Sequence, residues 1–180
     1  MGPLLRISGA IDGLNAACAK VAEWMVLIAV LISAGNAFSR YLFSISSNAW
    51  LEIQWYLFGA MFMLGAALTL KLNEHVRVDL VYLALSPRRQ LWIDLFGFLI
   101  LFLPAMMILT WLSWPVFWNS FSSGEISGNA GGLPRWPVKL FLPLGFFLLT
   151  LQGLSELIKR AAALHGLRGL DTAEYKRPDQ

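Results

Sequence analysis

Four long apolar stretches dominate the sequence and limit what the chain can fold into. They run from about residue 21 to 42, 50 to 72, 92 to 118 and 138 to 158. A helix needs roughly 20 mostly apolar residues to cross the hydrocarbon core of a bilayer, and each stretch meets that length. None shows the sustained alternation of apolar and polar residues that is typical of membrane β-barrel strands. The sequence therefore predicts an all-α integral membrane bundle of four transmembrane helices.

The composition agrees with a lipid environment and excludes several functions. Charged residues make up 14% of the 180 residues, against about 25% in soluble domains. The single cysteine, Cys18, cannot form an intrachain disulfide, and the absence of a Gly-Lys dipeptide excludes a phosphate-binding P-loop. The net charge of +3 comes from basic residues that flank the apolar stretches, which indicates membrane lipid as a partner and no nucleic acid.

The distribution of basic residues predicts the orientation of the chain. Eleven of the 14 Lys and Arg residues lie in the N-terminal segment, the second loop and the tail, and three lie in the first and third loops. Because cytoplasmic loops carry the excess of Lys and Arg, both termini are expected in the cytoplasm. We therefore divide the chain into a cytoplasmic segment (1–20), a transmembrane domain (21–160) and a cytoplasmic, disordered tail (161–180).

Two local patterns add detail to this arrangement. In the second loop, Val76, Leu80 and Leu83 recur with helical spacing, which predicts a short interfacial amphipathic helix between the second and third spans. In the third span, Pro104 and Pro115 remove backbone donors, so we expect this helix to be kinked or broken late.

The sequence offers little for cofactor or catalytic chemistry. The only histidines, His75 and His165, lie outside the spans, so two histidines cannot hold a haem within the bundle. Glu74, His75 and Asp79 are the nearest approach to a metal cluster, but hydrated interfacial residues explain them better. No carboxylate falls in mid-span, where a proton relay would need one. We expect no cofactor, no metal site and no enzymatic activity.

Two features of the spans are candidates for structural or interface roles. Arg40 and Glu52 fall near the outer ends of neighbouring spans, where they either pair or extend separately to the membrane surface. Ala29, Ser33 and Ala37 follow one another at intervals of four residues. Such small residues let helices approach closely, either within the bundle or against another membrane protein.

Several short motifs follow one another along the spans and the second loop. In chain order they are Arg40-Tyr41, Glu52, Leu64-Gly65-Ala66-Ala67, Asn73-Glu74-His75-Val76-Arg77-Val78-Asp79 and Leu85-Ser86-Pro87-Arg88-Arg89-Gln90. Over residues 21–160 their order resembles the small membrane subunit (DctQ-like, or Q subunit) of tripartite ATP-independent periplasmic (TRAP) transporters. We add His75, Arg77 and Asp79 to the interface or structural candidates.

The resemblance implies a function in transport. Gly131-Gly132-Leu133-Pro134 and Leu151-Gln152-Gly153 are similar to the branch labelled for mannitol and chloroaromatic compounds and associated with 2-oxo acids. A small subunit of this family is expected in the bacterial inner membrane. There it would scaffold a large membrane subunit for sodium-coupled uptake of an organic acid, delivered by a periplasmic solute-binding protein.

Two other functions are compatible with a four-span chain. One is a self-sufficient small dimeric transporter of the multidrug type, and the other is a four-helix membrane redox or assembly protein. The sequence lacks a mid-span charge, a cofactor ligand and an internal repeat, which favours a scaffold over both.

Overall fold

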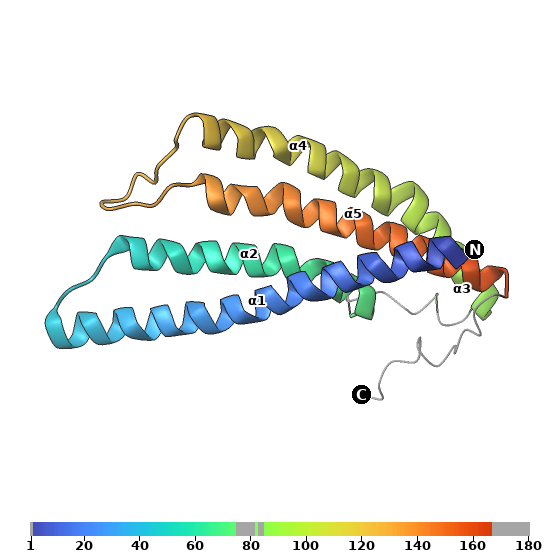
Figure 1. Cartoon of the computed structure of the whole chain (residues 1–180), viewed down its shortest axis with the longest axis horizontal. Coiled ribbons are helices and arrows are strands. Elements are labelled where there is room, and N and C mark those ends of the chain that lie inside the picture. The colour runs from blue at the N-terminus through green and yellow to red at the C-terminus, as the bar shows by residue number, and fades with distance from the viewer. Residues whose placement is uncertain (1, 75–81, 83–84, 167–180) are drawn as a thin grey trace.

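The computed structural model describes residues 2–74, 82 and 85–166 (Figure 1). Its helices, in chain order, are α1 (Gly2–Phe43), α2 (Asn48–Leu72), α3 (Pro87–Phe96), the π-helical segment η2 (Gly97–Phe102), α4 (Leu103–Ser122) and α5 (Trp136–Leu164). The segments α3, η2 and α4 follow one another without a break. Four helical stretches in this part of the chain are long and apolar enough to cross a membrane, which confirms the predicted all-α, four-span fold.

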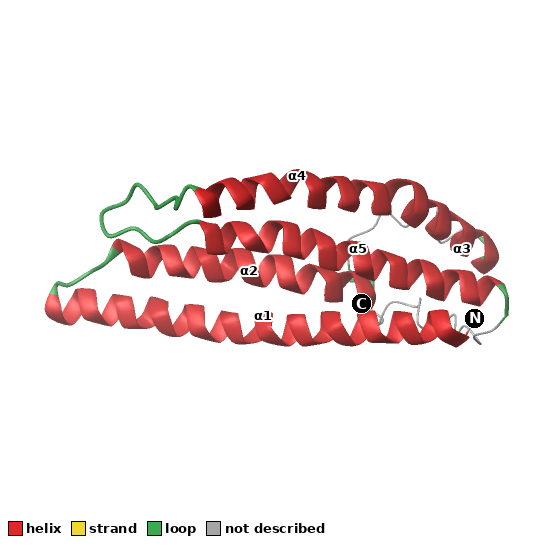
Figure 2. Cartoon of the chain, turned by 45° about the horizontal axis from the view of Figure 1, so that its top comes forward, coloured by secondary structure: helices red, strands yellow, loops and turns green. Residues whose placement is uncertain are grey.

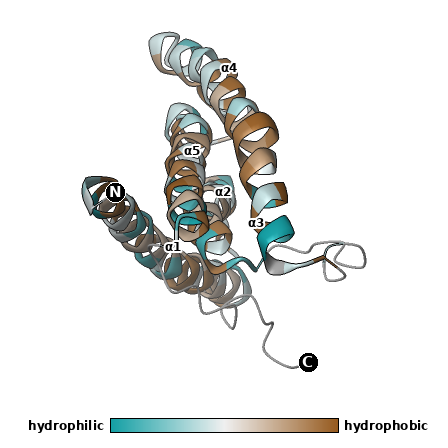
Figure 3. Ribbon diagram, turned by 90° about the vertical axis from the view of Figure 1, so that its right-hand side faces the viewer, coloured by the Kyte–Doolittle hydropathy of each residue, from teal (hydrophilic) through white to brown (hydrophobic). Residues whose placement is uncertain are grey.

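The helices form an open layer. α1 packs on α2, α2 on α5 and α5 on α4, and α1 also contacts α5, whereas α4 makes no comparable contact with α1 or α2 (Figure 2). The start of α1, α3 and the end of α5 lie together at one end of the molecule, here called the inner end. The α1–α2 and α4–α5 connections lie at the opposite, outer end. Viewed along the helices, α1 and α4 lie on opposite sides of α2 and α5 (Figure 3).

Small residues allow the helices of this layer to approach closely. The buried apolar cluster consists of Ala22, Leu64, Ala67 and Leu148, from α1, α2 and α5. A Cβ atom added at Gly145 would lie 2.7 Å from the Met63 side chain, so α2 and α5 touch where α5 has no side chain. In lipid, such contacts replace much of the hydrophobic drive that holds helices together in water.

The third span departs from the sequence-based expectation. α4 continues through Pro115 to Ser122, so the third span is not broken late, and a late kink stays a prediction. The irregular segment is η2, which ends just before Pro104. Pro104 has no N–H to donate, and the N–H of Leu103 reaches back five residues to the carbonyl of Phe98. The wider π-helical turn therefore absorbs the missing donor early in the span.

Other predictions fall partly or wholly beyond the described residues. Residues 2–20, expected as a separate cytoplasmic segment, form one continuous helix with the first span, and the point where α1 enters the bilayer stays a prediction. The interfacial helix of the second loop, most of the tail, and the candidates His75, Arg77 and Asp79 lie outside the described residues.

Candidate functional site

Polar side chains of α1 and α5 face each other inside the protein at the inner end. The Oγ atoms of Ser8 and Ser155 lie 2.7 Å apart, and Asn15 Nδ2 donates to Gln152 Oε1 at 2.7 Å. Ser155 Oγ also donates to Asp12 Oδ1 at 2.8 Å. All of these residues except Asp12 are buried, and Asp12 is mostly covered. The start of α1 is therefore joined to α5 by hydrogen bonds rather than by apolar contact alone.

Charged side chains extend this contact to α2. Lys159 Nζ lies 2.7 Å from an Asp12 carboxylate oxygen and 2.8 Å from Glu156 Oε1. Lys71 Nζ, on α2, lies 4.0 Å from the same Asp12 oxygen, Oδ2. Asp12 thus links three helices.

Arg160 connects α5 to the third span. Its Nε lies 3.2 Å from Asp94 Oδ2 on α3, and its Nη1 lies 2.6 Å from Glu156 Oε2. The guanidinium also lies 4.5 Å from the centroid of the Phe98 ring in η2. Arg160 is only 5% exposed, so these partners take the place of water around its guanidinium group.

We call this group of residues the inner cluster. Its members are Ser8, Asp12, Asn15, Lys71, Asp94, Gln152, Ser155, Glu156, Lys159 and Arg160. The cluster contains three carboxylates and three basic groups, so its formal net charge is zero. Buried charges are tolerated only when they are paired and hydrogen-bonded, and this balance meets that condition. Among the described residues, no group of His, Cys, Asp and Glu side chains is placed to hold a metal ion.

Sequence reasoning missed the inner cluster because it counted the basic members as cytoplasmic charges and assigned no partners to the polar members on α1 and α5. A signal was present. Ser8, Asp12 and Asn15 lie at i, i+4 and i+7, which places them on one helix face. Gln152, Ser155, Glu156 and Lys159 have the same kind of spacing. Two polar faces near the same predicted end of the membrane would have suggested the contact.

At the outer end, the loop between α4 and α5 holds Glu52. This carboxylate accepts hydrogen bonds from Ser127 Oγ, from Asn129 Nδ2 at 2.6 Å and from the Leu133 N–H at 2.8 Å. Among the described residues no ion pair joins it to Arg40, which is exposed at the end of α1. Within the described chain the loop supplies the donors that the Glu52 carboxylate needs. A pairing of Arg40 with Glu52 through the large subunit stays a prediction.

The same loop is ordered by contacts of its own. Ile126 and Pro134 form an isolated antiparallel bridge, and a Cβ added at Gly132 would lie 2.6 Å from that of Ser127. The Glu125 carboxylate binds Lys139 and lies 3.6 Å from Arg135. The hydrogen bond from Lys139 holds the pKa of Glu125 below its usual range.

We call the second group of residues the outer cluster. Its members are Glu52, Glu125, Ser127, Asn129, Leu133, Arg135 and Lys139.

The small-residue stripe of α1 is divided between two environments. Ala29 is 3% exposed and packs within the protein, whereas Ser33 and Ala37 are exposed. Ala29 thus serves the contacts within the chain, and the other two residues leave a smooth surface open to lipid or to another helix.

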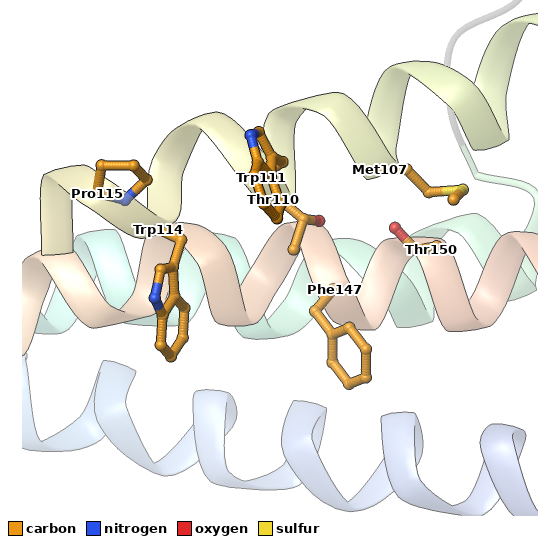
Figure 4. Close-up of a pocket in the computed structure, with 7 residues that line it drawn as sticks. All are labelled: Met107, Thr110, Trp111, Trp114, Pro115, Phe147 and Thr150. Carbon is orange, nitrogen blue, oxygen red and sulfur yellow. The ribbon is translucent and has the colours of Figure 1, made fainter. Parts of the chain in front are cut away.

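An apolar groove of about 580 Å³ lies between α4 and α5 (Figure 4). It is lined by Met107, Thr110, Trp111, Trp114, Pro115, Phe147 and Thr150. The hydroxyls of Thr110 and Thr150 donate to carbonyls of their own helices, at 2.7 and 2.8 Å. The groove therefore offers no titratable group and little hydrogen bonding to a ligand.

Comparison with known protein families decides between the functions considered above. A model of the DctQ component of tripartite ATP-independent periplasmic transporters matches residues 28–163. The chain belongs to this family. It is the small membrane subunit of a TRAP transporter and a multi-pass membrane protein, and the DctQ family is a family of transporter components rather than of enzymes. No curated protein and no solved structure matches the chain.

The residues matched by the family include all of the outer cluster but only part of the inner cluster. It includes the whole outer cluster and the α2, α3 and α5 members of the inner cluster. Ser8, Asp12 and Asn15, which complete the inner cluster from α1, precede the matched residues. The start of α1 is therefore a part of this DctQ subunit that only the structure connects to the rest.

Proposed function

We propose that this small subunit is a scaffold that holds the large membrane subunit while the transporter takes up an organic acid together with sodium. The observation that carries the proposal is the placement of the polar groups. Apart from the exposed pair of Lys20 and Glu23 on α1, the ion pairs of the described residues lie in the inner and outer clusters. Coupled carriers instead place ion and substrate sites near the middle of the membrane, at interrupted helices.

The open layer supports this proposal. Large aromatic side chains stand out from it, among them Trp55 (77% exposed), Phe62 (73%) and Trp111 (78%). A membrane protein with so much apolar surface is covered by lipid or by another membrane protein. An open arrangement of helices presents a broad face to a neighbour, which is what a scaffold requires.

The remaining parts of the proposal come from the sequence and the family. The excess of Lys and Arg favours an inner-membrane protein with both termini in the cytoplasm. The branch resemblance favours a substrate of the 2-oxo acid type, delivered by a periplasmic binding protein. His75, Arg77 and Asp79 are proposed to contribute to the surface that meets the large subunit.

Reconstitution tests the function. Liposomes that hold this chain alone should show no sodium-dependent uptake of a 2-oxo acid. Addition of the large subunit and the loaded binding protein should restore uptake. Sodium-driven accumulation by the chain alone would contradict the scaffold and favour a dimeric transporter.

Labelling with an impermeant thiol reagent tests the orientation. In a Cys18→Ser background, a cysteine at Ser127 should react from outside and a cysteine at Ser86 should not. The reverse pattern would refute the proposed topology.

A further inference from the structure

We infer that Arg88 and Arg89, at the start of α3, bind the headgroup of an anionic phospholipid whose acyl chains lie along the apolar face that follows them. The inference goes beyond the proposed function, because it concerns only this chain and the bilayer. It also gives a function to the motif at residues 85–90, which the scaffold role leaves unused.

The packing of α3 turns its only carboxylate inward and its basic residues outward. Asp94 is 8% exposed and binds Arg160 in the inner cluster. Gln90, one turn earlier on the same side, donates two hydrogen bonds to carbonyls of the loop before α3. Arg88 and Arg89 are exposed on the other side of the helix. No acidic residue of α3 is therefore left to pair with them.

The two guanidinium groups have no protein partner in the part of the chain that the structure describes. Neither Arg88 nor Arg89 forms an ion pair or a side-chain hydrogen bond there. The basic residues of both clusters, by contrast, each lie within 4.0 Å of a carboxylate. Arg6 and Arg40 are also unpaired among the described residues, but neither has a basic neighbour in sequence. Two adjacent unpaired arginines form a site suited to an anion.

The helix itself adds to this positive charge. The first turn of α3 contains no acidic residue, and the side chain of Ser86 does not cap it. The start of a helix carries the positive end of the helix dipole, so basic residues there are unfavourable unless an anion offsets them. Guanidinium groups bind phosphate oxygens with paired hydrogen bonds, which makes a phosphate group a suitable anion.

An exposed apolar face begins one turn beyond the arginines. Trp92, Ile93 and Phe96 are exposed, and Ile100 continues the face in η2. Because Arg89, Ile93 and Phe96 follow one another at i, i+4 and i+7, they lie on one side of the helix. Figure 3 shows the hydrophilic start of α3 and the hydrophobic helix beyond it. A charged end followed by an apolar face matches the shape and polarity of a phospholipid.

The length of the third span places its ends at the depth of the headgroups. The span from Arg88 to Ser122 has 35 residues and is about 52 Å long. The hydrocarbon core is about 30 Å thick, and the whole bilayer about 40–45 Å. Apart from the buried Asp94, no charged residue lies between Arg89 and the end of the span. The two arginines are therefore the groups of this span that the headgroup layer stabilises.

The chemistry of the site favours an anionic lipid over a zwitterionic one. Phosphatidylcholine carries a cation beside its phosphate, which two arginines repel, whereas phosphatidylglycerol carries none. Each arginine near an anionic membrane surface strengthens binding about fivefold. A soluble phosphate would satisfy the arginines but leave the apolar face uncovered, so the lipid is the better occupant.

Lipid binding to the purified, delipidated chain in detergent tests the site. Bound phosphatidylglycerol and phosphatidylcholine are counted by native mass spectrometry. We expect phosphatidylglycerol to bind at least about tenfold more tightly, and Arg88→Gln or Arg89→Gln each to weaken its binding about fivefold. Arg6→Gln is the matched control, because it removes one charge at the same end of the molecule (Figure 1). Small Gly9 and Ala10 follow Arg6 instead of an apolar face, so binding should not change.

The other outcomes refute the site. Equal affinity for the two lipids, or no binding of either, would do so directly. Equal weakening by Arg6→Gln would show a general effect of net charge. Glycerol 3-phosphate at the same concentration should not displace the lipid, and equal competition would show a site for soluble anions. Circular dichroism checks that each variant keeps its helix content.

Photolabelling of the unmodified chain provides a second measurement that needs no substitution. Phosphatidylglycerol with a photoreactive acyl chain should label residues 92–100 at least about tenfold more strongly than phosphatidylcholine of the same kind. Equal labelling by the two lipids, or labelling that favours other segments, would refute the site. Neither measurement uses the large subunit, so failure here leaves the scaffold proposal standing, and failure of the scaffold leaves the lipid site standing.

Discussion

The two ends of the molecule neutralise their charges in different ways. At the inner end, side chains of separate helices bind one another, and the α1–α5 hydrogen bonds join residues 137 to 147 positions apart. At the outer end, one loop folds over a single carboxylate and offers it a hydroxyl, an amide and a backbone N–H. The inner cluster therefore positions helices, whereas the outer cluster positions a loop.

The two ends also differ in their exposure to water. The side chains of Asp94, Glu156 and Arg160 are at most 10% exposed. Those of Glu125 and Arg135 are 32% and 47% exposed. Water and salt screen exposed pairs, while a buried charge that loses its partner cannot be compensated. Substitutions at the inner end should therefore cost more than equivalent ones at the outer end.

The largest expected effect follows from Arg160→Met. The substitution leaves Asp94 and Glu156 facing each other without their shared cation, and removal of one partner from a buried pair costs about 3–5 kcal/mol. We expect a clear loss of thermal stability of the purified protein in detergent. Lys139→Met removes a comparable cation at the outer end and is the control. Equal losses of melting temperature in the two variants would contradict the difference between the ends.

Gly153→Ala should have the next largest effect. An added Cβ would lie 2.8 Å from the Phe102 ring, so α5 and η2 would have to separate beside the inner cluster. Overpacking of this kind costs about 1–3 kcal/mol. Gly65→Ala adds the same atom where nothing lies within 4 Å, and alanine there should be neutral or stabilising. A melting temperature unchanged by Gly153→Ala would show that helix spacing at the inner end is not constrained.

Glu52→Gln should act on the outer loop and leave the helices intact. The neutral amide loses the charge-assisted hydrogen bonds from the loop, so amide exchange in residues 123–135 should accelerate by about tenfold. Global melting should change little. Arg40→Ala is the control and should leave loop exchange unaltered, and the two substitutions should be additive in a double-mutant cycle. Strong coupling between them would indicate a pair that forms in the assembled transporter.

The smallest expected effect is a pH dependence of the same loop. The pKa of Glu125 is lowered in the folded protein by the hydrogen bond from Lys139, so its ionised form favours the folded loop. This contribution is present above the ordinary glutamate pKa of about 4.3 and is lost as the pH falls through the lower, folded-state value. Loop exchange should therefore rise in that acidic range. Lys139→Gln should shift this rise in loop exchange toward a pH of about 4.3. An unshifted pH profile would show that the hydrogen bond from Lys139 is not what lowers the pKa of Glu125.

Local properties of the sequence were sufficient to predict the membrane architecture. Helix length and hydropathy depend on neighbouring residues, so the four spans could be read without knowledge of their packing. The order of short motifs was likewise enough to indicate the DctQ family. Each of these properties depends on many residues, so an error at one position does not change the prediction.

Only the tertiary structure decided how the polar residues are paired. Glu52 has its partners 75 to 81 positions away, and Arg40, a closer neighbour in sequence, is not among them. Asp12 was assigned to the cytoplasmic segment and Arg160 to the very end of the transmembrane domain, although both form contacts between helices. Hydropathy says which residues avoid lipid, but the choice of partner depends on the direction of each side chain and on which helices are adjacent. Those are fixed only when small residues such as Gly145 and Gly153 bring α2, α5 and η2 into contact.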